Sequence, residues 1–322
     1  MIMYDEYMRG YKQVNKLGFS NNNYQPIPQN YLDQQQFVVF RTCHSFGDWA
    51  IISAIPKLLK RKYPKCTIAI PSPECLNRYY NQDQWTNKSN DPFNNVLEVF
   101  SANPYIDGMI DYIPKDLPIY HDHFRVYDDE CPNIPLTEQI LKYWGFSEDE
   151  MMDSQPDLYW TDEEKQEGDR IIKNIIKTED YGFLYLDDTF YIECPNPIRE
   201  PLDLKRRVLQ NYIDQNSISK KIKWLYYSAK DMCDMVYRLP ESSLDVRSIN
   251  TTLRIQSYIK SKSKLIIGHQ GGYGTDCMSR YAPCYIVPNT YNHINEHIVR
   301  GTKYISCYED KEDISLSTKK MI

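Results

Sequence analysis

The sequence has little glycine, no excess of basic residues and no long apolar run. Its 322 residues include 12 glycines but 28 tyrosines, and the formal net charge is -6. That charge argues against a general polyanion binder, because nonspecific affinity for nucleic acid comes from clustered positive charge. No apolar segment approaches the roughly 20 residues that span a bilayer, and the N-terminus has no signal-peptide core. We therefore expect a cytoplasmic protein without a transmembrane segment.

The cysteines and histidines follow no metal or disulfide pattern. Nine cysteines, an odd number, are scattered without C-x-x-C spacing, which predicts neither a disulfide framework nor a zinc site. His121 and His123 lie beside acidic residues in the segment 121–130, and imidazole and carboxylate are metal ligands. Because no third ligand follows at helical spacing, we interpret this segment as a polar loop, leave its role open and expect no metal or cofactor.

A stretch near the N-terminus has the pattern of a strand, a loop, a helix and a second strand. Residues 37–40 are β-branched or aromatic, as in a buried strand. Gly47 supplies conformational freedom at the strand-to-helix junction, and a helix begins near Asp48 and is interrupted by Pro56. Residues 66–70 form the next strand, so the unit is βαβ with parallel pairing. Asp48 then lies at the carboxyl end of the first strand, where open α/β sheets bind ligands.

Further along the chain, strand and helix patterns continue to alternate. The run 96–100 predicts another strand, ahead of an Asn-Pro turn at 103–104. A helix follows Pro135, and Thr161 with three acidic residues behind it is typical of a helix N-terminus. We expect three parts: a polar N-terminal extension (1–35), an N-terminal α/β domain (36–177) and a C-terminal α/β domain with a tail (178–322).

A second functional stretch follows a buried strand in the C-terminal half. The strand expected at 264–268, with the sequence Lys-Leu-Ile-Ile-Gly, leads into a histidine and a loop that contains three glycines. Glycine lets the backbone approach a ligand closely, and the N–H groups at the start of a following helix favour an anion such as a diphosphate. The residues expected to bind it are His269, Gln270, Gly271, Gly272, Gly274 and Thr275.

These stretches together resemble glycosyltransferase family 9, the ADP-heptose:lipopolysaccharide heptosyltransferases. The similarity lies in Gly47-Asp48, Ala54-Ile55-Pro56, Tyr63-Pro64, the Asn-Pro-Tyr-Ile-Asp phrase at 103–107, and the glycine loop with Ala282-Pro283 behind it. The resemblance implies a GT-B fold, in which two Rossmann-like domains face each other across a cleft. It also implies an inverting, metal-independent reaction on a nucleotide sugar.

The resemblance carries over unevenly to single residues. Asp48 matches the family's proposed general base, whereas His269 stands where the family has an aspartate, and the family's histidine falls near Gly274. Donor binding by the amides of the loop is therefore expected, but the identity of the sugar is not implied. Arg206 is expected to contact the donor diphosphate. The residues expected to orient the acceptor or donor are Arg41, His44 and Gly47.

We therefore predict an enzyme, a glycosyltransferase that moves a sugar from a nucleotide-sugar donor to a hydroxyl of a glycan or lipid-linked glycan. The many tyrosines, asparagines and lysines are typical of an AT-rich genome, and a virus-encoded enzyme that glycosylates a hydroxymethylated DNA base in the host cytoplasm is one alternative. A non-catalytic nucleotide- or sugar-binding protein of the same fold is another. An NAD-dependent oxidoreductase is excluded, because no Gly-x-Gly-x-x-Gly follows the first strand. The sequence leaves open the sugar, the nucleotide, the acceptor and the oligomeric state.

Overall fold

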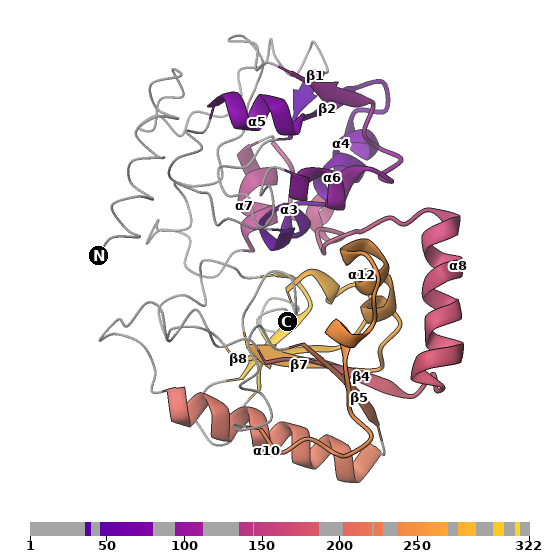
Figure 1. Cartoon of the computed structure of the whole chain (residues 1–322). Coiled ribbons are helices and arrows are strands. Elements are labelled where there is room, and N and C mark those ends of the chain that lie inside the picture. Colours follow the sequence, from indigo (N-terminus) through magenta and orange to yellow (C-terminus); the bar gives the residue numbers. More distant parts are fainter. Residues whose placement is uncertain are drawn as a thin grey trace. The chain divides into compact units, whose positions relative to one another are not determined.

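The computed structural model places the chain in two compact units (Figure 1). Unit 1 comprises Met1–Tyr159 and unit 2 Trp160–Ile322, and each is described by itself. The described residues are 36–39, 46–79, 94–111, 135–143, 145–186, 202–220, 222–227, 237–269, 276–287, 299–305 and 313–315.

Unit 1 contains a parallel sheet with the order β1-β2-β3 among its described strands. Its strands are β1 (Gln36–Val38), β2 (Thr67–Pro71) and β3 (Gly108–Ile110). Its helices are α3 (Phe46–Ile51), α4 (Ile55–Lys62), α5 (Pro73–Tyr79), α6 (Asn95–Phe100), α7 (Leu136–Tyr143) and the 3-10 helix η3 (Asp149–Met151). The predicted βαβ unit is therefore present, with β1 and β2 parallel.

Two helices of unit 1 differ from the prediction. The run 96–100 forms helix α6, so the prediction of a strand there was wrong. The reason is its periodicity, since the buried side chains Val96, Val99 and Phe100 recur at helical spacing on one face. The helix expected from Asp48 begins two residues earlier and is broken before Pro56, with turns over 52–54.

The Asn-Pro-Tyr-Ile-Asp phrase at 103–107 has a structural task in unit 1. Asn103 Oδ1 accepts a hydrogen bond from the Tyr105 N–H at 3.0 Å, which closes the turn. Asp107 Oδ2 accepts from Lys60 Nζ and from the Ile68 N–H, both at 2.7 Å. Burial alone would raise the pKa of the Asp107 carboxyl, but these two hydrogen bonds outweigh burial and lower it. The phrase therefore joins the approach to β3 to both β2 and α4.

Unit 2 contains a seven-stranded sheet with the order β10-β9-β8-β7-β4-β5-β6. Neighbouring strands are parallel except for β10, which pairs antiparallel with β9. The strands are β4 (Tyr181–Tyr185), β5 (Lys223–Tyr227), β6 (Leu244–Asp245), β7 (Ile266–His269), β8 (Cys284–Val287), β9 (Thr302–Ile305) and β10 (Asp313–Ser315). The helices are α8 (Asp162–Ile171), the π-helix η4 (Ile172–Ile176), α10 (Leu202–Lys220), α12 (Leu253–Ser261) and the 3-10 helices η5 (Val246–Ser248) and η6 (Asp276–Met278).

Helices cover both faces of this sheet, with α10 on one side and α12 on the other (Figure 1). On the first side, Leu209 and Ile213 of α10 pack into a buried cluster with Leu184 and Trp224 from the strands. Alternate residues of β4 point to the opposite face, where the Tyr181 hydroxyl donates to the α12 carbonyl of Ile259 at 2.7 Å. Because both faces are covered, the central strands β4 and β7 are buried along their whole length.

Helix α8 belongs to unit 2 because it packs against α12. Its predicted N-cap is present, since Thr161 and Glu164 form a reciprocal capping box. Glu164 also binds the Arg254 guanidinium of α12 through two hydrogen bonds, one of them at 2.8 Å from Nη2. The units accordingly divide before α8, whereas the sequence placed the boundary after it, at 178.

Candidate functional site

The strand order of unit 2 determines where a ligand site is expected. The chain runs from β4 outward to β5 and β6, then returns to the other side of β4 and continues through β7, β8 and β9. This is the doubly wound order, and the direction of winding reverses between β4 and β7. A crevice forms outside the carboxyl ends of the strands at such a reversal, because the loops on its two sides diverge to opposite faces.

The predicted donor loop begins at this reversal point. His269 is the last residue of β7, and its side chain is fully buried. The Tyr237 hydroxyl lies 2.7 Å from His269 Nε2, and Tyr237 itself belongs to the cluster under α10. The two residues therefore fix the end of β7 to the core of the unit. Gln270, Gly271, Gly272, Gly274 and Thr275 lie outside the described residues.

The strands approach each other closely at the same edge. Tyr227, Tyr185 and Gly268 are register partners across β5, β4 and β7. The rings of Tyr185 and Tyr227 are stacked, with centroids 5.6 Å apart and 5° between planes. A Cβ on Gly268 would lie 2.7 Å from Tyr185 Cβ and 2.9 Å from its backbone nitrogen. Gly268 is thus required by the packing of the edge, whatever the loop beyond it binds.

In unit 1 the predicted base lies on α3, the first helix after β1. The backbone of Asp48 is within α3, between Gly47 and Trp49, while its side chain lies outside the described part. Trp49 is fully buried, and its ring packs edge-on against Phe100 of α6 with centroids 6.2 Å apart. Arg41 and His44, which precede α3, also lie outside the described residues.

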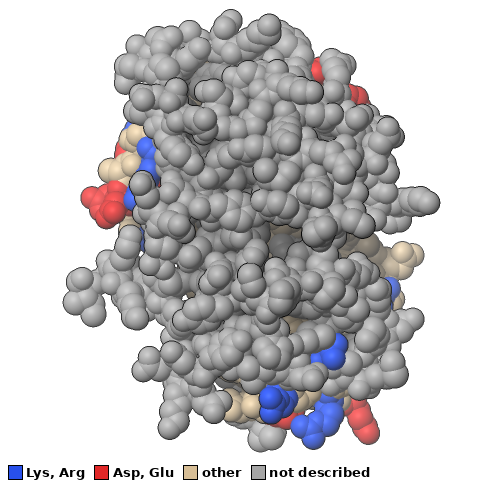
Figure 2. All heavy atoms as spheres, turned by 90° about the vertical axis from the view of Figure 1, so that its left-hand side faces the viewer, with Lys and Arg blue, Asp and Glu red and all other residues tan. Residues whose placement is uncertain are grey.

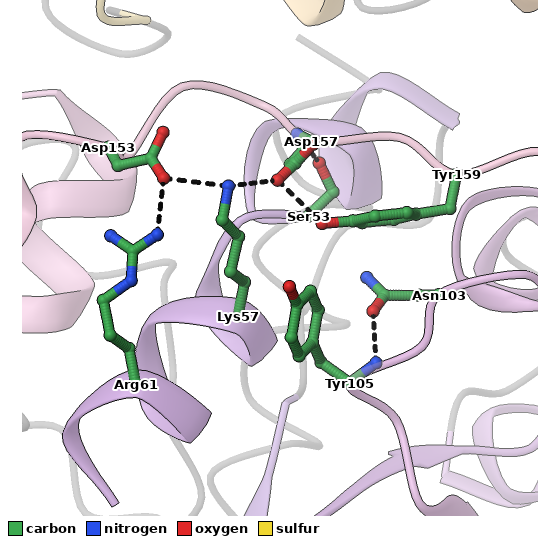
Figure 3. A network of polar contacts seen from close by, with 8 residues as sticks. All are labelled: Ser53, Lys57, Arg61, Asn103, Tyr105, Asp153, Asp157 and Tyr159. Carbon is green, nitrogen blue, oxygen red and sulfur yellow. Dashed lines mark hydrogen bonds and ion pairs between the residues drawn. The ribbon is translucent and has the colours of Figure 1, made fainter. Parts of the chain in front are cut away.

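A polar network joins Ser53 and the α4 residue Lys57 to residues 153–159 at the end of unit 1 (Figure 3). Lys57 Nζ lies 2.8 Å from a carboxylate oxygen of Asp153 and 2.8 Å from one of Asp157. The Asp157 carboxylate also accepts a hydrogen bond from the Tyr159 hydroxyl at 2.8 Å. The backbone N–H of Asp157 donates to Ser53 Oγ at 2.8 Å. Asp157 is buried, so its carboxylate is satisfied by these partners in place of water.

Arg206 and its neighbour differ in exposure on α10. Arg206 is half-buried, whereas Arg207 is exposed. Figure 2 shows basic side chains with an acidic one near them at the lower end of the view. Arg238, whose backbone N–H donates to Gln210 of α10, also lies 3.4 Å from Asp214 of that helix. Mixed charge of this kind is typical of a solvated helix face, and the contact of Arg206 with a diphosphate stays a prediction.

Within the described ranges, no helix is long and apolar enough to cross a membrane. No group of three His, Cys, Asp or Glu residues in that part of the chain is arranged to hold a metal ion. The segment 121–130, with its histidines and acids, lies outside those ranges.

Sequence reasoning missed the residues that support the two predicted stretches. Tyr237 lies 32 positions before His269, and no local pattern links the two. Ser53 and Asp157 are separated by 104 positions. Tyr185 and Tyr227 were detectable in principle, because each is the last residue of an apolar strand whose carboxyl end faces the expected crevice.

Comparisons with known proteins agree with this architecture. No protein-family model matches the sequence, and the search of curated proteins found no relative. The solved structure of a family 9 glycosyl transferase from Veillonella parvula DSM 2008 matches with a TM-score of 0.54 at 10% identity, over 88% of this chain and 92% of that one. E. coli ADP-heptose LPS heptosyltransferase II matches with a TM-score of 0.48 at 11% identity, over 88% and 94%. POFUT1 in complex with GDP matches with a TM-score of 0.32 at 13% identity, over 84% and 98%.

The Veillonella structure shows the fold of this chain. The match extends along nearly the whole of both proteins, and the two units are α/β with parallel sheets, as the sequence predicted. At 10% identity the similarity is one of fold. The chain therefore shares the two-unit α/β fold of that structure, and the predicted resemblance to family 9 is confirmed at the level of the fold.

Proposed function

We propose that the protein is an inverting, metal-independent glycosyltransferase that uses a nucleotide-sugar donor. The observation that carries this proposal is the fold shared with a family 9 glycosyl transferase along nearly the whole chain. Two features of this chain support it. The glycine loop starts at the reversal point of the unit 2 sheet, and Asp48 lies on the first helix after β1.

In the proposed reaction, unit 2 binds the donor diphosphate. Amide N–H groups of the 271–275 loop and the Arg206 guanidinium would stabilise the negative charge that develops on the leaving nucleoside diphosphate. His269 is fully buried against Tyr237, so we assign it to holding the start of the loop. Direct contact with the sugar then falls to the loop itself.

Asp48 would supply the base. Its carboxylate accepts the proton of the acceptor hydroxyl while that oxygen attacks the anomeric carbon. The bond from the anomeric carbon to the diphosphate breaks as the new carbon–oxygen bond forms on the opposite face, which inverts the configuration. The acceptor is a glycan or lipid-linked glycan in this proposal.

A screen of nucleotide sugars tests the proposal. Thermal shift and donor hydrolysis would be measured for the wild type and Asp48→Ala with EDTA present and no metal added. The proposal predicts that one donor raises the Tm of both proteins, and that only the wild type transfers its sugar to an acceptor extract. If no nucleotide or nucleotide sugar raises either Tm, the proposal is wrong. Stabilisation without any turnover by the wild type would instead indicate a binding protein of the same fold.

A further inference from the structure

Helix α3 is too short to fix its own orientation. It has six residues, Phe46–Ile51, which is fewer than two turns. Isolated helices of this length are unstable in water, so tertiary contacts determine where such a helix points. Asp48 lies two residues from Ala50 and three from Ile51, which end the helix. The contacts at that end therefore bear on the position of Asp48.

Hydroxyl groups satisfy the last two carbonyl oxygens of α3. The Ser53 hydroxyl donates to the Ala50 carbonyl at 2.6 Å. The Thr137 hydroxyl, from α7, donates to the Ile51 carbonyl at 2.7 Å. Both hydroxyl-bearing residues are buried. The Ala50 carbonyl also accepts the Ser53 backbone N–H at 3.1 Å. Loss of the Thr137 hydroxyl should therefore matter most at the Ile51 carbonyl, because a buried carbonyl left without a partner is destabilising.

The Ser53 hydroxyl is itself held by the end of unit 1. Its oxygen accepts the backbone N–H of Asp157 at 2.8 Å. The Asp157 carboxylate is in turn fixed by Lys57 and Tyr159, each at 2.8 Å (Figure 3). The carboxyl end of α3 is thus attached to two segments distant in the sequence, α7 and the stretch around Asp157.

We propose that Ser53 and Thr137 are positioning residues for Asp48. They hold the carboxyl end of α3 through its backbone, and with it the backbone position from which Asp48 would act on the acceptor hydroxyl. This inference rests on the proposed function, because it assigns the positioned group the role of the base. Displacement of a reacting group by about 1 Å can lower a rate by about 10²-fold.

The test is a pair of substitutions at Thr137 with a matched control. Thr137→Val keeps the shape and removes the hydroxyl, and Thr137→Ser keeps the hydroxyl. Ser154→Ala is the control, since buried Ser154 donates to Glu138 of the same helix α7 at 3.0 Å without bonding to α3. Transfer kinetics and amide hydrogen exchange over 46–53 would be measured for each variant.

Thr137→Val is expected to lower kcat about tenfold, with the donor KM within about twofold of the wild type. Exchange at the amides of Ile52 and Ser53, which bond to carbonyls of α3, should become faster. Thr137→Ser should restore both properties, and Ser154→Ala should change neither. Suppose that Asp48→Ala is inactive. Wild-type kcat in Thr137→Val would then overturn the positioning role, and so would a loss of kcat in Ser154→Ala as large as that in Thr137→Val. If Asp48→Ala is itself active, the proposed function fails, and the positioning role fails with it.

Discussion

The two candidate sites, helix α3 in unit 1 and the carboxyl end of β7 in unit 2, are held in place in different ways. In unit 1, the helix that carries Asp48 has six residues, and its end is held by the hydroxyls of nearby Ser53 and of Thr137 from distant α7. In unit 2, the loop predicted to bind the donor follows β7, which is paired on both sides by parallel strands. The position of α3 depends on individual side chains, whereas the position of the end of β7 depends on backbone pairing across the sheet.

This difference separates two kinds of sensitivity to mutation. If the proposed positioning role holds, loss of a hydroxyl near α3 should displace one functional group and leave the sheet of unit 1 intact. A change in the spacing of β4 and β7 disturbs the core of unit 2, and the loop with it. The substitutions below are chosen to break or sharpen this contrast, and the largest expected effect comes first.

Gly268→Ala should destabilise the protein most. The added Cβ would lie 2.9 Å from the backbone nitrogen of Tyr185, and two paired strands cannot separate to admit it. We expect a loss of about 3 kcal/mol in the free energy of unfolding, measured by urea denaturation. Gly108→Ala is the control, because a Cβ there meets nothing within 4 Å. Equal stabilities of the two variants would contradict the backbone-based account of this edge.

Asp157→Ala should cost about 2 kcal/mol in unfolding free energy. The substitution removes the buried carboxylate that accepts from Lys57 and Tyr159, although Asp153 still neutralises Lys57. The hydrogen bond from the backbone N–H of residue 157 to Ser53 Oγ is kept in this variant. The control is an exposed ion pair between Lys165 and Asp162, whose side chains are 45% and 83% exposed. Asp162→Ala should lower the free energy of unfolding by less than about 0.5 kcal/mol. A cost for Asp157→Ala as small as this would show that the network does not stabilise unit 1.

Glu164→Gln should destabilise unit 2 in a pH-dependent way. Burial favours a raised pKa for the Glu164 carboxyl, but the hydrogen bonds from Arg254 and from the Thr161 N–H outweigh burial and lower it. Because the folded-state pKa is lowered, this carboxylate stabilises the fold above the unfolded-state pKa of about 4.3, and the stabilisation is lost as the pH falls through the folded-state value. The loss at pH 7 should be about 1.5 kcal/mol. Tm values of wild type and variant should converge at low pH, and a constant difference down to pH 2 would refute this assignment.

Arg206→Ala should have the smallest of these effects, and on ligand binding only. Loss of a partly exposed charge near the diphosphate is worth about 1 kcal/mol, or about fivefold in donor Kd. Arg207→Ala removes a neighbouring but exposed charge and should leave the donor Kd unchanged. Calorimetric titration of the two variants gives the comparison. Equal affinities would assign both arginines to the solvated face of α10.

The sequence predicted those parts of the fold that local patterns encode. The βαβ unit, the capping box at Thr161 and the strand before His269 are each specified by neighbouring residues, and the structure contains them. The run 96–100 was misassigned, because β-branched residues favour strands only where packing agrees, and here one helical face is buried against α3.

The supporting residues of the candidate site were beyond local patterns. Thr137 bonds to α3 across 86 positions, and Tyr237 bonds to His269 across 32. Such pairs arise when the topology brings distant segments together, and neither partner has a distinctive sequence signature. Candidate residues could therefore be named from the sequence, but the contacts that support them could not.

The most direct test of the account compares donor binding with turnover in two variants. Asp48→Asn changes the predicted base, and Tyr237→Phe removes the hydroxyl beside His269 while keeping the ring in the core. Donor Kd by calorimetry and kcat at saturating donor would be measured for both. The account predicts wild-type Kd but at least a 100-fold loss of kcat for Asp48→Asn, and a weaker Kd with kcat retained for Tyr237→Phe. Wild-type turnover by Asp48→Asn, or a loss of donor binding in that variant alone, would contradict the assignment of the base to unit 1 and of the donor to unit 2.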